Sequence, residues 1–355
     1  MNPMSLASSK ALLAIGLGLC ASVAVAANSY QARNLVSDGG VTADHHDGNL
    51  VNGWGVAFNP NGFVWVADNG TGVSTLYDGF GNPQSLVVSI PGVGGAAGTP
   101  TGIVFNGSGD FVVRNSTAAG PARFIFASED GRISGWAPNV DGTHALPAVF
   151  MADAVYKGLT VASSAGGNRL YAADFHGHKI DVFRSNYVPV KLPGAFVDPN
   201  VPSNYAPFNI LLLGGRLYVA YAQKEEDGDD EVAGPGLGIV DAYDTNGQLL
   251  QRIATAGTLN APWGMALAPA GFGDFSNRLL VGNFGDGKIN AYDVATGQFL
   301  GQLRAPNGDV LAIDGLWGMA FGNNLNSQPS TTLFFAAGPH DEESGLYGRI
   351  DVASP

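Results

Sequence analysis

The stretch Pro262-Trp263-Gly264-Met265-Ala266-Leu267 returns 54 residues later as Leu316-Trp317-Gly318-Met319-Ala320-Phe321. Each copy is a short apolar run built around one glycine, which is typical of a buried strand. Weaker copies precede them at Asn52–Phe58, Thr101–Phe105, Lys157–Val161 and Phe208–Leu212. Aligned on the central Gly or Asn, the six copies follow one another at steps of 47, 56, 51, 55 and 54 residues. A period of this length predicts the blades of a β-propeller.

Further strands follow each copy. A second β-rich run comes next, as in Val64–Asp68, Phe111–Asn115 and Leu170–Asp174, and a third follows in most units. Turn pairs such as Asp78-Gly79 and Asp130-Gly131 then lead to a fourth strand. The sequence therefore predicts an all-β fold: a six-bladed β-propeller of four-stranded antiparallel blades.

The last unit ends at Gly348–Val352, too early to supply its own fourth strand. The segment Tyr30–Val36 belongs to no unit and has the length of a strand. We expect this N-terminal strand to complete the last blade and close the ring, which removes free sheet edges.

The composition supports this fold and excludes some partners. Gly and Pro together make 71 of 355 residues, and 24 of the 30 acids are Asp, which favours turns over helix interiors. The formal net charge is −13 for the whole chain. Such an acidic surface argues against a nucleic-acid partner or an anionic membrane.

Residues 1–26 resemble a signal peptide, with Lys10 before the apolar run Ala11–Ala21 and a small-x-small cleavage pattern at Ala24-Val25-Ala26. We therefore expect export, to the periplasm or the extracellular space, and a single propeller domain at residues 27–355. The only cysteine, Cys20, lies in this leader. No other apolar stretch is long enough to span a bilayer, so no membrane anchor is expected.

In a propeller, the loop that leads into each innermost strand and the loop between strands two and three emerge on one face, which we call the front face. Asp, Asn and His side chains from four blades are predicted there. They are the candidate ligand- or metal-binding residues Asn52, Asp68, Asn69, Asp174, His176, His178, Asn283, Asp286 and His340. Carboxylates around a concave mouth focus a negative potential, so we expect a cation or a cationic group as the guest, with a divalent cation such as calcium as the cofactor to test.

Some of these residues also have a purely structural interpretation. Asp68, Asp174 and Asn283 each end a second strand, where a short polar side chain can cap a turn. The glycine after Trp54, Trp263 and Trp317 lets six inner strands converge. These tryptophans either pack between blades or line the mouth of the channel.

Other clusters leave the same choice open. Asp44-His45-His46-Asp47 is either a metal site or a surface loop. His176 and His178 would lie on one side of a strand, a geometry that suits a shared ligand. The run Glu225–Glu231 has the acidic composition of a calcium loop but lacks its glycine position, which favours a solvated insertion.

Long stretches of the chain resemble a family of exported bacterial β-propellers of unknown function. The matching stretches are Leu50–Gly55, Ala67–Gly72, Phe124–Trp136, Tyr156–Leu159, Ala206–Ile210, Ala261–Gly264, Leu280–Gly287, Asp314–Gly318 and Ala337–Pro339. More distantly, the blades are similar to NHL repeats and to the gluconolactonase group, in which Glu, Asn and Asp hold a divalent metal. That metal-binding set has no residue-by-residue match in this chain.

Two functions are consistent with these observations. The first is an exported propeller whose polar face binds a small molecule, a glycan or a protein. The second is a divalent-metal-dependent hydrolase of the lactonase type. The convergence of three or more Asp, Asn or His groups within metal-bonding distance at the channel mouth would favour the second.

Overall fold

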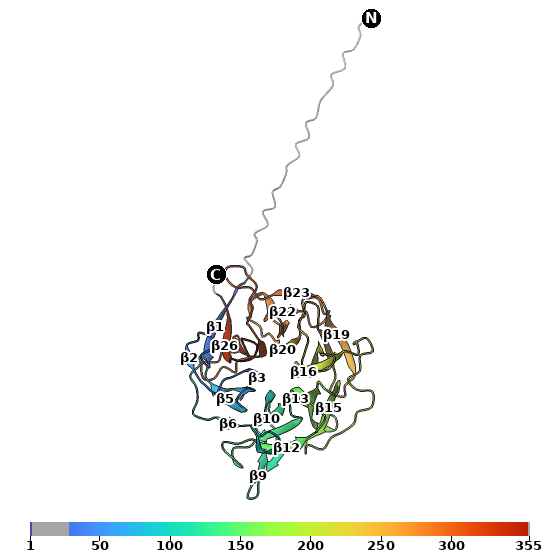
Figure 1. Ribbon diagram of the computed structural model, residues 1–355. Coiled ribbons are helices and arrows are strands. Elements are labelled where there is room, and N and C mark those ends of the chain that lie inside the picture. Colours follow the sequence, from blue (N-terminus) through green and yellow to red (C-terminus); the bar gives the residue numbers. More distant parts are fainter. Residues whose placement is uncertain (2–27, 354–355) are drawn as a thin grey trace.

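The innermost strands form a ring of six around a central axis. The computed structural model describes Met1 and residues 28–353, so the predicted leader lies outside the described residues apart from Met1. The six inner strands are β3 (Gly53–Phe58), β7 (Pro100–Phe105), β13 (Tyr156–Ser164), β16 (Tyr205–Leu213), β20 (Pro262–Leu267) and β24 (Leu316–Phe321). Each contains one copy of the repeated pattern, which confirms the predicted blade order (Figure 1).

The sheets radiate from these inner strands and run antiparallel outward. Blade 1 continues with β4 (Val64–Asp68), β5 (Val73–Tyr77) and β6 (Val88–Ser89), and blade 2 with β10 (Phe124–Ser128), β11 (Arg132–Trp136) and β12 (Leu146–Phe150). Blade 3 continues with β14 (Gly167–Asp174) and β15 (Lys179–Arg184), and blade 4 with β17 (Arg216–Gln223), β18 (Ile239–Tyr243) and β19 (Leu249–Thr255). Blade 5 continues with β21 (Leu279–Asn283), β22 (Ile289–Tyr292) and β23 (Phe299–Gln302).

Blade 6 is completed by the N-terminal strand, as predicted. Its own strands are β24, β25 (Leu333–Ala337) and β26 (Leu346–Val352), and β1 (Tyr30–Ser37) pairs antiparallel with β26 from Tyr30–Val352 to Ser37–Leu346. The short strand β2 (His45–His46) then pairs parallel with β1, so the predicted surface loop at this point is a sheet edge. Both ends of the described propeller therefore belong to one blade (Figure 1).

Blade 2 differs from the sequence prediction. Phe111–Asn115 does not form its second strand; it contributes β8 (Val112–Arg114) to a separate hairpin with β9 (Ala119–Pro121). The second strand is β10, whose Phe126 pairs with Ile103 of the inner strand. The prediction failed because this inserted hairpin is itself rich in β-forming residues. As a consequence, the Asp130-Gly131 turn joins strands two and three and lies on the front face.

Blade 3 also departs from the predicted four strands, because the described sheet contains only β13, β14 and β15. The chain after β15 turns back and forms a single bridge between Phe183 and Pro189. Pro189 and Pro193 lack the backbone N–H that a strand ladder needs, so pairing does not extend.

The glycines of the inner strands allow neighbouring blades to touch. A Cβ atom on Gly318 would lie 2.3 Å from the carbonyl oxygen of Trp54, and one on Gly264 would lie 2.4 Å from that of Trp317. These distances are shorter than the contacts that Cβ atoms make in proteins. Alanine therefore cannot occupy either position unless the backbone moves. The predicted reason for these glycines is therefore confirmed.

Helices contribute almost nothing to the fold. Within residues 28–353 the helical elements are two three-residue turns, Val93–Gly95 and Gly273–Phe275. No helix in the described part of the chain is long and apolar enough to cross a bilayer.

Candidate functional site

Three tryptophans fill the centre of the ring. Trp54 stacks on Trp317 with ring centroids 3.6 Å apart, and Trp263 meets both edge-on at 5.9 and 5.8 Å. All three are buried, together with Phe208 and, less completely, Phe284. Of the two interpretations, packing between blades and lining the channel mouth, their burial and the stack between neighbouring blades 1 and 6 agree with the first. The tryptophans form an aromatic plug that we call the floor.

A buried lysine lies on this floor. Lys157 precedes the inner glycine of blade 3, and its side chain is only 2% exposed. Its ammonium group donates to Glu129 Oε1 at 2.7 Å and to Asp230 Oδ1 at 3.3 Å, and lies 5.2 Å from the ring centroid of Trp54. An ammonium group can be this deeply buried because carboxylates and an aromatic face replace its hydration.

Two amides extend the network to blades 1 and 6. Asn52 donates to Glu342 Oε2 at 2.6 Å and accepts from the indole N–H of Trp317 at 3.0 Å. Asn69 lies 3.5 Å from Asn52 and donates to Glu129 Oε2 at 2.9 Å. A continuous chain of polar contacts therefore joins loops from five blades. We call it, with the adjacent Glu231, the mouth network: Asn52, Asn69, Glu129, Lys157, Asp230, Glu231 and Glu342.

Backbone geometry holds two of these side chains in place. Asn52 has φ of 48°, and the loop of blade 6 carries three consecutive left-handed residues, His340, Asp341 and Glu342. Asparagine tolerates this region, but Glu342 does so at a cost of about 1 kcal/mol. Such strained backbone is found mostly at binding and catalytic sites, where the surrounding structure holds it.

The acids of the mouth network outnumber its single cation. Burial opposes the charge of Lys157, but Glu129, Glu231 and Asp230 offset it, so the lysine pKa is raised and the ammonium form persists. Burial raises the pKa of Glu231 to about 7, with Lys157 opposing the rise and Glu342 adding to it. Four carboxyl groups thus share one ammonium group, and negative charge is in excess.

Burial also raises the pKa of Glu342, although its hydrogen bond from Asn52 favours the ionised form. The charges of Glu129 and Asp230 add to this rise. A cation placed among these groups would relieve their mutual repulsion, so the arrangement can bind positive charge.

The structure brings two of the nine predicted site residues, Asn52 and Asn69, into the mouth network. Asp68 lies elsewhere, fully buried inside blade 1, where burial raises its pKa well above the usual range despite the nearby hydroxyl group of Thr75. Among the described residues its carboxyl oxygens have no hydrogen-bond partner. Although Asp68 precedes Asn69 in the chain, no hydrogen bond joins its side chain to the mouth network within residues 28–353.

Three further candidates make hydrogen bonds or ion pairs with neighbouring loop and turn residues. Asp174 Oδ1 accepts the backbone N–H groups of Gly177 at 2.9 Å and Val155 at 3.2 Å, which is the turn-capping role considered from the sequence. Asn283 donates to Asp286 Oδ1 at 2.9 Å and to a backbone carbonyl group of its own blade. Asp286 also pairs with the neighbouring Lys288 at 3.1 Å.

The histidine candidates are separated from one another. His176 and His178 lie in the turn between β14 and β15, not in a strand, so the predicted shared geometry is wrong. His176 contacts Asp229 at 2.7 Å, whereas His178 contacts the carbonyl oxygen of Tyr205 at 3.2 Å. His340 contacts Ser344 at 3.3 Å.

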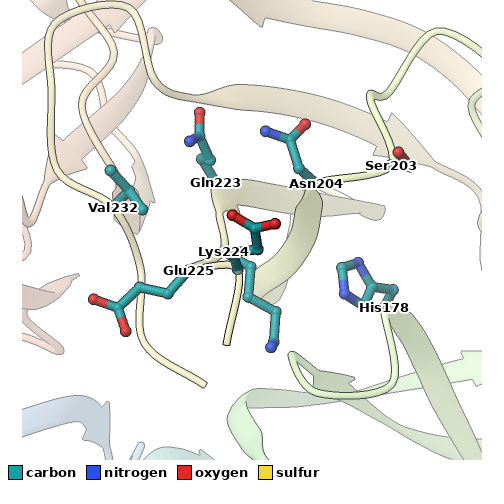
Figure 2. Close-up of a pocket in the computed structure, with 8 residues that line it drawn as sticks. His178, Ser203, Asn204, Gln223, Lys224, Glu225 and Val232 are labelled. Carbon is teal, nitrogen blue, oxygen red and sulfur yellow. The ribbon is translucent and has the colours of Figure 1, made fainter. Parts of the chain in front are cut away.

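His178 instead lines a polar pocket of about 460 Å³ between blades 3 and 4 (Figure 2). Asn204, Gln223, Lys224 and Glu225 project around the same space. The acidic run Glu225–Glu231 forms one wall and is not simply solvated. Its far end, Asp230 and Glu231, belongs to the mouth network.

Five network residues were missing from the predicted candidates: Glu129, Lys157, Asp230, Glu231 and Glu342. Of these, Asp230 and Glu231 were considered only as part of the run Glu225–Glu231. Lys157 could have been predicted from the sequence. When the six repeats are aligned on their central Gly or Asn, it occupies the position of Trp54 and Trp263, and it is the only charged residue at that position. Glu129 was hidden by the wrong strand assignment in blade 2.

The described residues contain no group of three or more His, Cys, Asp and Glu side chains arranged to hold a metal ion. This applies both to the front face and to the segment Asp44–Asp47. The lactonase-type hypothesis therefore gains no support from the described geometry and stays a prediction, as does calcium binding.

No family model matches the chain. Two proteins of Acanthamoeba polyphaga mimivirus match it over most of its length: Uncharacterized protein R648 is 34% identical over 337 residues, and Uncharacterized protein L690 is 33% identical over 335. The matches cover 92% and 91% of this chain and 81% and 86% of those proteins. The chain belongs to their family. These relatives are viral, so the bacterial and exported parts of the expected resemblance stay predictions.

Solved structures share the fold at low identity. A protein of unknown function from Bacteroides thetaiotaomicron has a TM-score of 0.56 and 10% identity, covering 91% of this chain and 76% of that chain. A streptogramin B lyase (TM-score 0.51, 11% identity) covers 92% and 98%. The PQQ-bound aldose sugar dehydrogenase of Streptomyces coelicolor (TM-score 0.51, 15% identity) covers 91% and 98%. Their different activities show that the fold alone assigns none.

Proposed function

We propose that the protein is an exported binding protein whose mouth network holds a cationic group of its ligand. The observation that carries this proposal is the excess of carboxyl groups: Glu129, Asp230, Glu231 and Glu342 surround the single ammonium group of Lys157. The buried face of Trp54 beneath stabilises the ammonium group of Lys157, which lies 5.2 Å from its ring centroid.

An organic cation fits this site better than a bare metal ion. Lys157 already lies between Glu129 and Asp230, where it occupies the central carboxylate contacts. A primary or quaternary ammonium group carried by a small molecule, a glycan or a protein side chain can join the two half-buried acids that Lys157 does not contact, Glu231 and Glu342, without displacing the lysine. Such binding weakens with salt because the partly exposed charges are screened.

Tryptophan fluorescence tests the proposal directly, because three of the five tryptophans form the floor. Putrescine, tetramethylammonium chloride and calcium chloride are titrated separately at constant ionic strength. We expect a saturable change with at least one of the ammonium probes. Glu342→Gln should weaken binding at least tenfold, because it removes one charge and keeps an acceptor for Asn52.

Glu343→Gln is the matched control, since Glu343 lies next to Glu342 on the same loop and is exposed. It changes the net charge equally and should leave binding unchanged. Equal weakening by both variants, or the absence of any saturable ammonium response, would show that the mouth network is not a cation site. A response to calcium alone would favour the metal-dependent alternative.

Export is tested separately by the mass of the protein recovered from the medium or periplasm of a secreting host. Cleavage after Ala26 predicts an N-terminus at Ala27. An intact N-terminus at Met1 in that fraction would contradict it.

A further inference from the structure

The outer edge of blade 3 is open where the other blades have a fourth strand. Within residues 28–353, the blade 3 sheet ends at β15, and the returning chain touches it only near Pro189. Val190 donates to the carbonyl oxygen of Val182 at 2.8 Å, and Arg184 donates to that of Val188 at 2.9 Å. Beyond these contacts the returning chain turns away at Leu192–Ala195.

The remaining length of β15 presents free backbone groups. The backbone N–H and C=O groups of Val182 and Arg184 point away from β14, because they bond to the returning chain. Every second residue of a strand has this orientation, so the backbone groups of Ile180 also point outward. Among the described residues, the outward N–H and C=O groups of Ile180 and the N–H group of Val182 have no partner. A row of such groups is a template for one more strand.

A cavity of about 690 Å³ lies beside this edge. It is lined by Met151 of blade 2, by Lys179–Phe183 and by Pro189–Phe196. Half-buried apolar side chains border it, including those of Ile180, Leu192 and Phe196. Val188 and Val197 are 49% and 58% exposed nearby. The edge is therefore apolar and has room for an added chain.

The charge of this region differs from that of the rest of the protein. Residues 179–197 contain Lys179, Arg184 and Lys191 against one acid, Asp181, whereas the whole chain has a net charge of −13. Lys179 is paired with Asp181 at 2.8 Å, which leaves Lys191 as the exposed cation that lines the cavity, while Arg184 is exposed at the end of β15. An acidic partner would be attracted here and repelled from most of the remaining surface.

We propose that β15 is a docking edge for an extended acidic peptide of another protein, which adds to blade 3 as its fourth strand. Backbone hydrogen bonds to Ile180 and Val182 would supply affinity, and alternate apolar side chains would enter the cavity. Acidic side chains at the rim of the cavity would approach Lys191, which is exposed there. A second copy of this chain fits less well, because two β15 strands paired about their centres would oppose Asp181 to Asp181.

The probe is a fluorescein-labelled peptide of alternating valine and glutamate, six residues long, measured by fluorescence polarisation. We expect saturable binding with a Kd on the order of 10 to 100 µM, as for a short added strand. Ile180→Pro removes the outward N–H group and breaks no internal hydrogen bond, so it should weaken binding at least tenfold. A peptide with proline at its third position should bind equally weakly to the wild-type protein.

Lys191→Glu is the second variant, because Lys191 is exposed and its substitution cannot prevent folding. It should weaken binding about fivefold or more, and Glu342→Gln in the mouth network should not. Binding that survives both groove variants, or that is absent at millimolar peptide, would overturn the proposal. Concentration-dependent dimers seen by sedimentation and lost in Ile180→Pro would also overturn it, in favour of self-association.

Discussion

Two regions of the molecule each hold one basic side chain among acids, and the ratio of acids to bases differs between them. In blade 4, Arg252 pairs with Asp198 at 2.5 Å and with Asp241 at 3.1 Å. Asp241 also accepts from Tyr243 at 3.2 Å. In the mouth network one lysine serves four carboxyl groups.

The difference separates a structural network from a binding one. In blade 4 the basic group and the acids satisfy one another, and both Asp side chains are almost fully buried. In the mouth network Asp230 is 75% exposed, and four carboxyl groups share one ammonium group. Burial raises the pKa of Glu231 to about 7 and that of Asp241 to about 6, so the two networks differ in exposure and in the number of acids for each cation rather than in these pKa values. The mouth network has more acids than bases and is open to solvent, so it can bind a further cation. The blade 4 network is buried and its groups are paired with one another, so it stabilises the fold.

The largest expected effect comes from breaking the blade 4 network. Arg252→Met leaves two buried carboxylates without a counter-charge and should lower the free energy of unfolding by about 3 to 5 kcal/mol, measured by urea denaturation. The triple variant with Asp198→Asn and Asp241→Asn should recover much of that loss. A loss below about 1 kcal/mol for Arg252→Met would remove the contrast between the two networks.

Lys157→Met should be less destabilising, by about 1 to 3 kcal/mol, because Glu129 and Asp230 keep access to water. The same change increases the excess of negative charge, so it should tighten binding of the ammonium probe. Fluorescence titration of the variant checks this second effect. Weaker binding would mean that Lys157 contacts the ligand itself.

A smaller effect follows from Glu231. Its pKa is about 7 in the folded protein and near 4.5 when unfolded, so between these values only the folded state holds the proton. The folded state therefore binds more protons, and stability falls as the pH rises from about 4.5 to 7, by at most about 1.4 kcal/mol per pH unit. The difference between wild type and Glu231→Gln across this range measures the effect. Parallel pH profiles would contradict it.

The smallest effect concerns a capping residue outside both networks. Asp174→Ala removes the acceptor of two backbone N–H groups and should cost about 1 kcal/mol of stability. Binding of the ammonium probe should not change, because Asp174 has no contact with the mouth network. Loss of binding with an unchanged melting temperature would restore Asp174 to the site.

Much of the fold could be predicted because apolar strands repeat at a nearly constant interval. The same spacing led to Asn52 and Asn69, since position within a repeat decides which face a loop occupies. The prediction of strands failed in blade 2, where an inserted hairpin has the composition expected of the second strand. It also failed in blade 3, where Pro189 and Pro193 prevent the pairing of a fourth strand. The contacts of Glu129 and Glu342 depend on side chains from distant blades meeting at the axis, which spacing along the chain does not encode.

The pairing of β1 with β26 has a consequence for how the protein is made. Tyr30 and Val352 are about 320 residues apart in the chain, yet they are neighbours in one sheet. A ribosome releases the N-terminal strand long before its partner exists, so this strand must wait unpaired through nearly the whole of synthesis. The entropic cost of such a closure grows only slowly with length, but the delay leaves an exposed edge that can pair wrongly. Translation speed and chaperones that bind extended segments should therefore affect its yield more than its final stability.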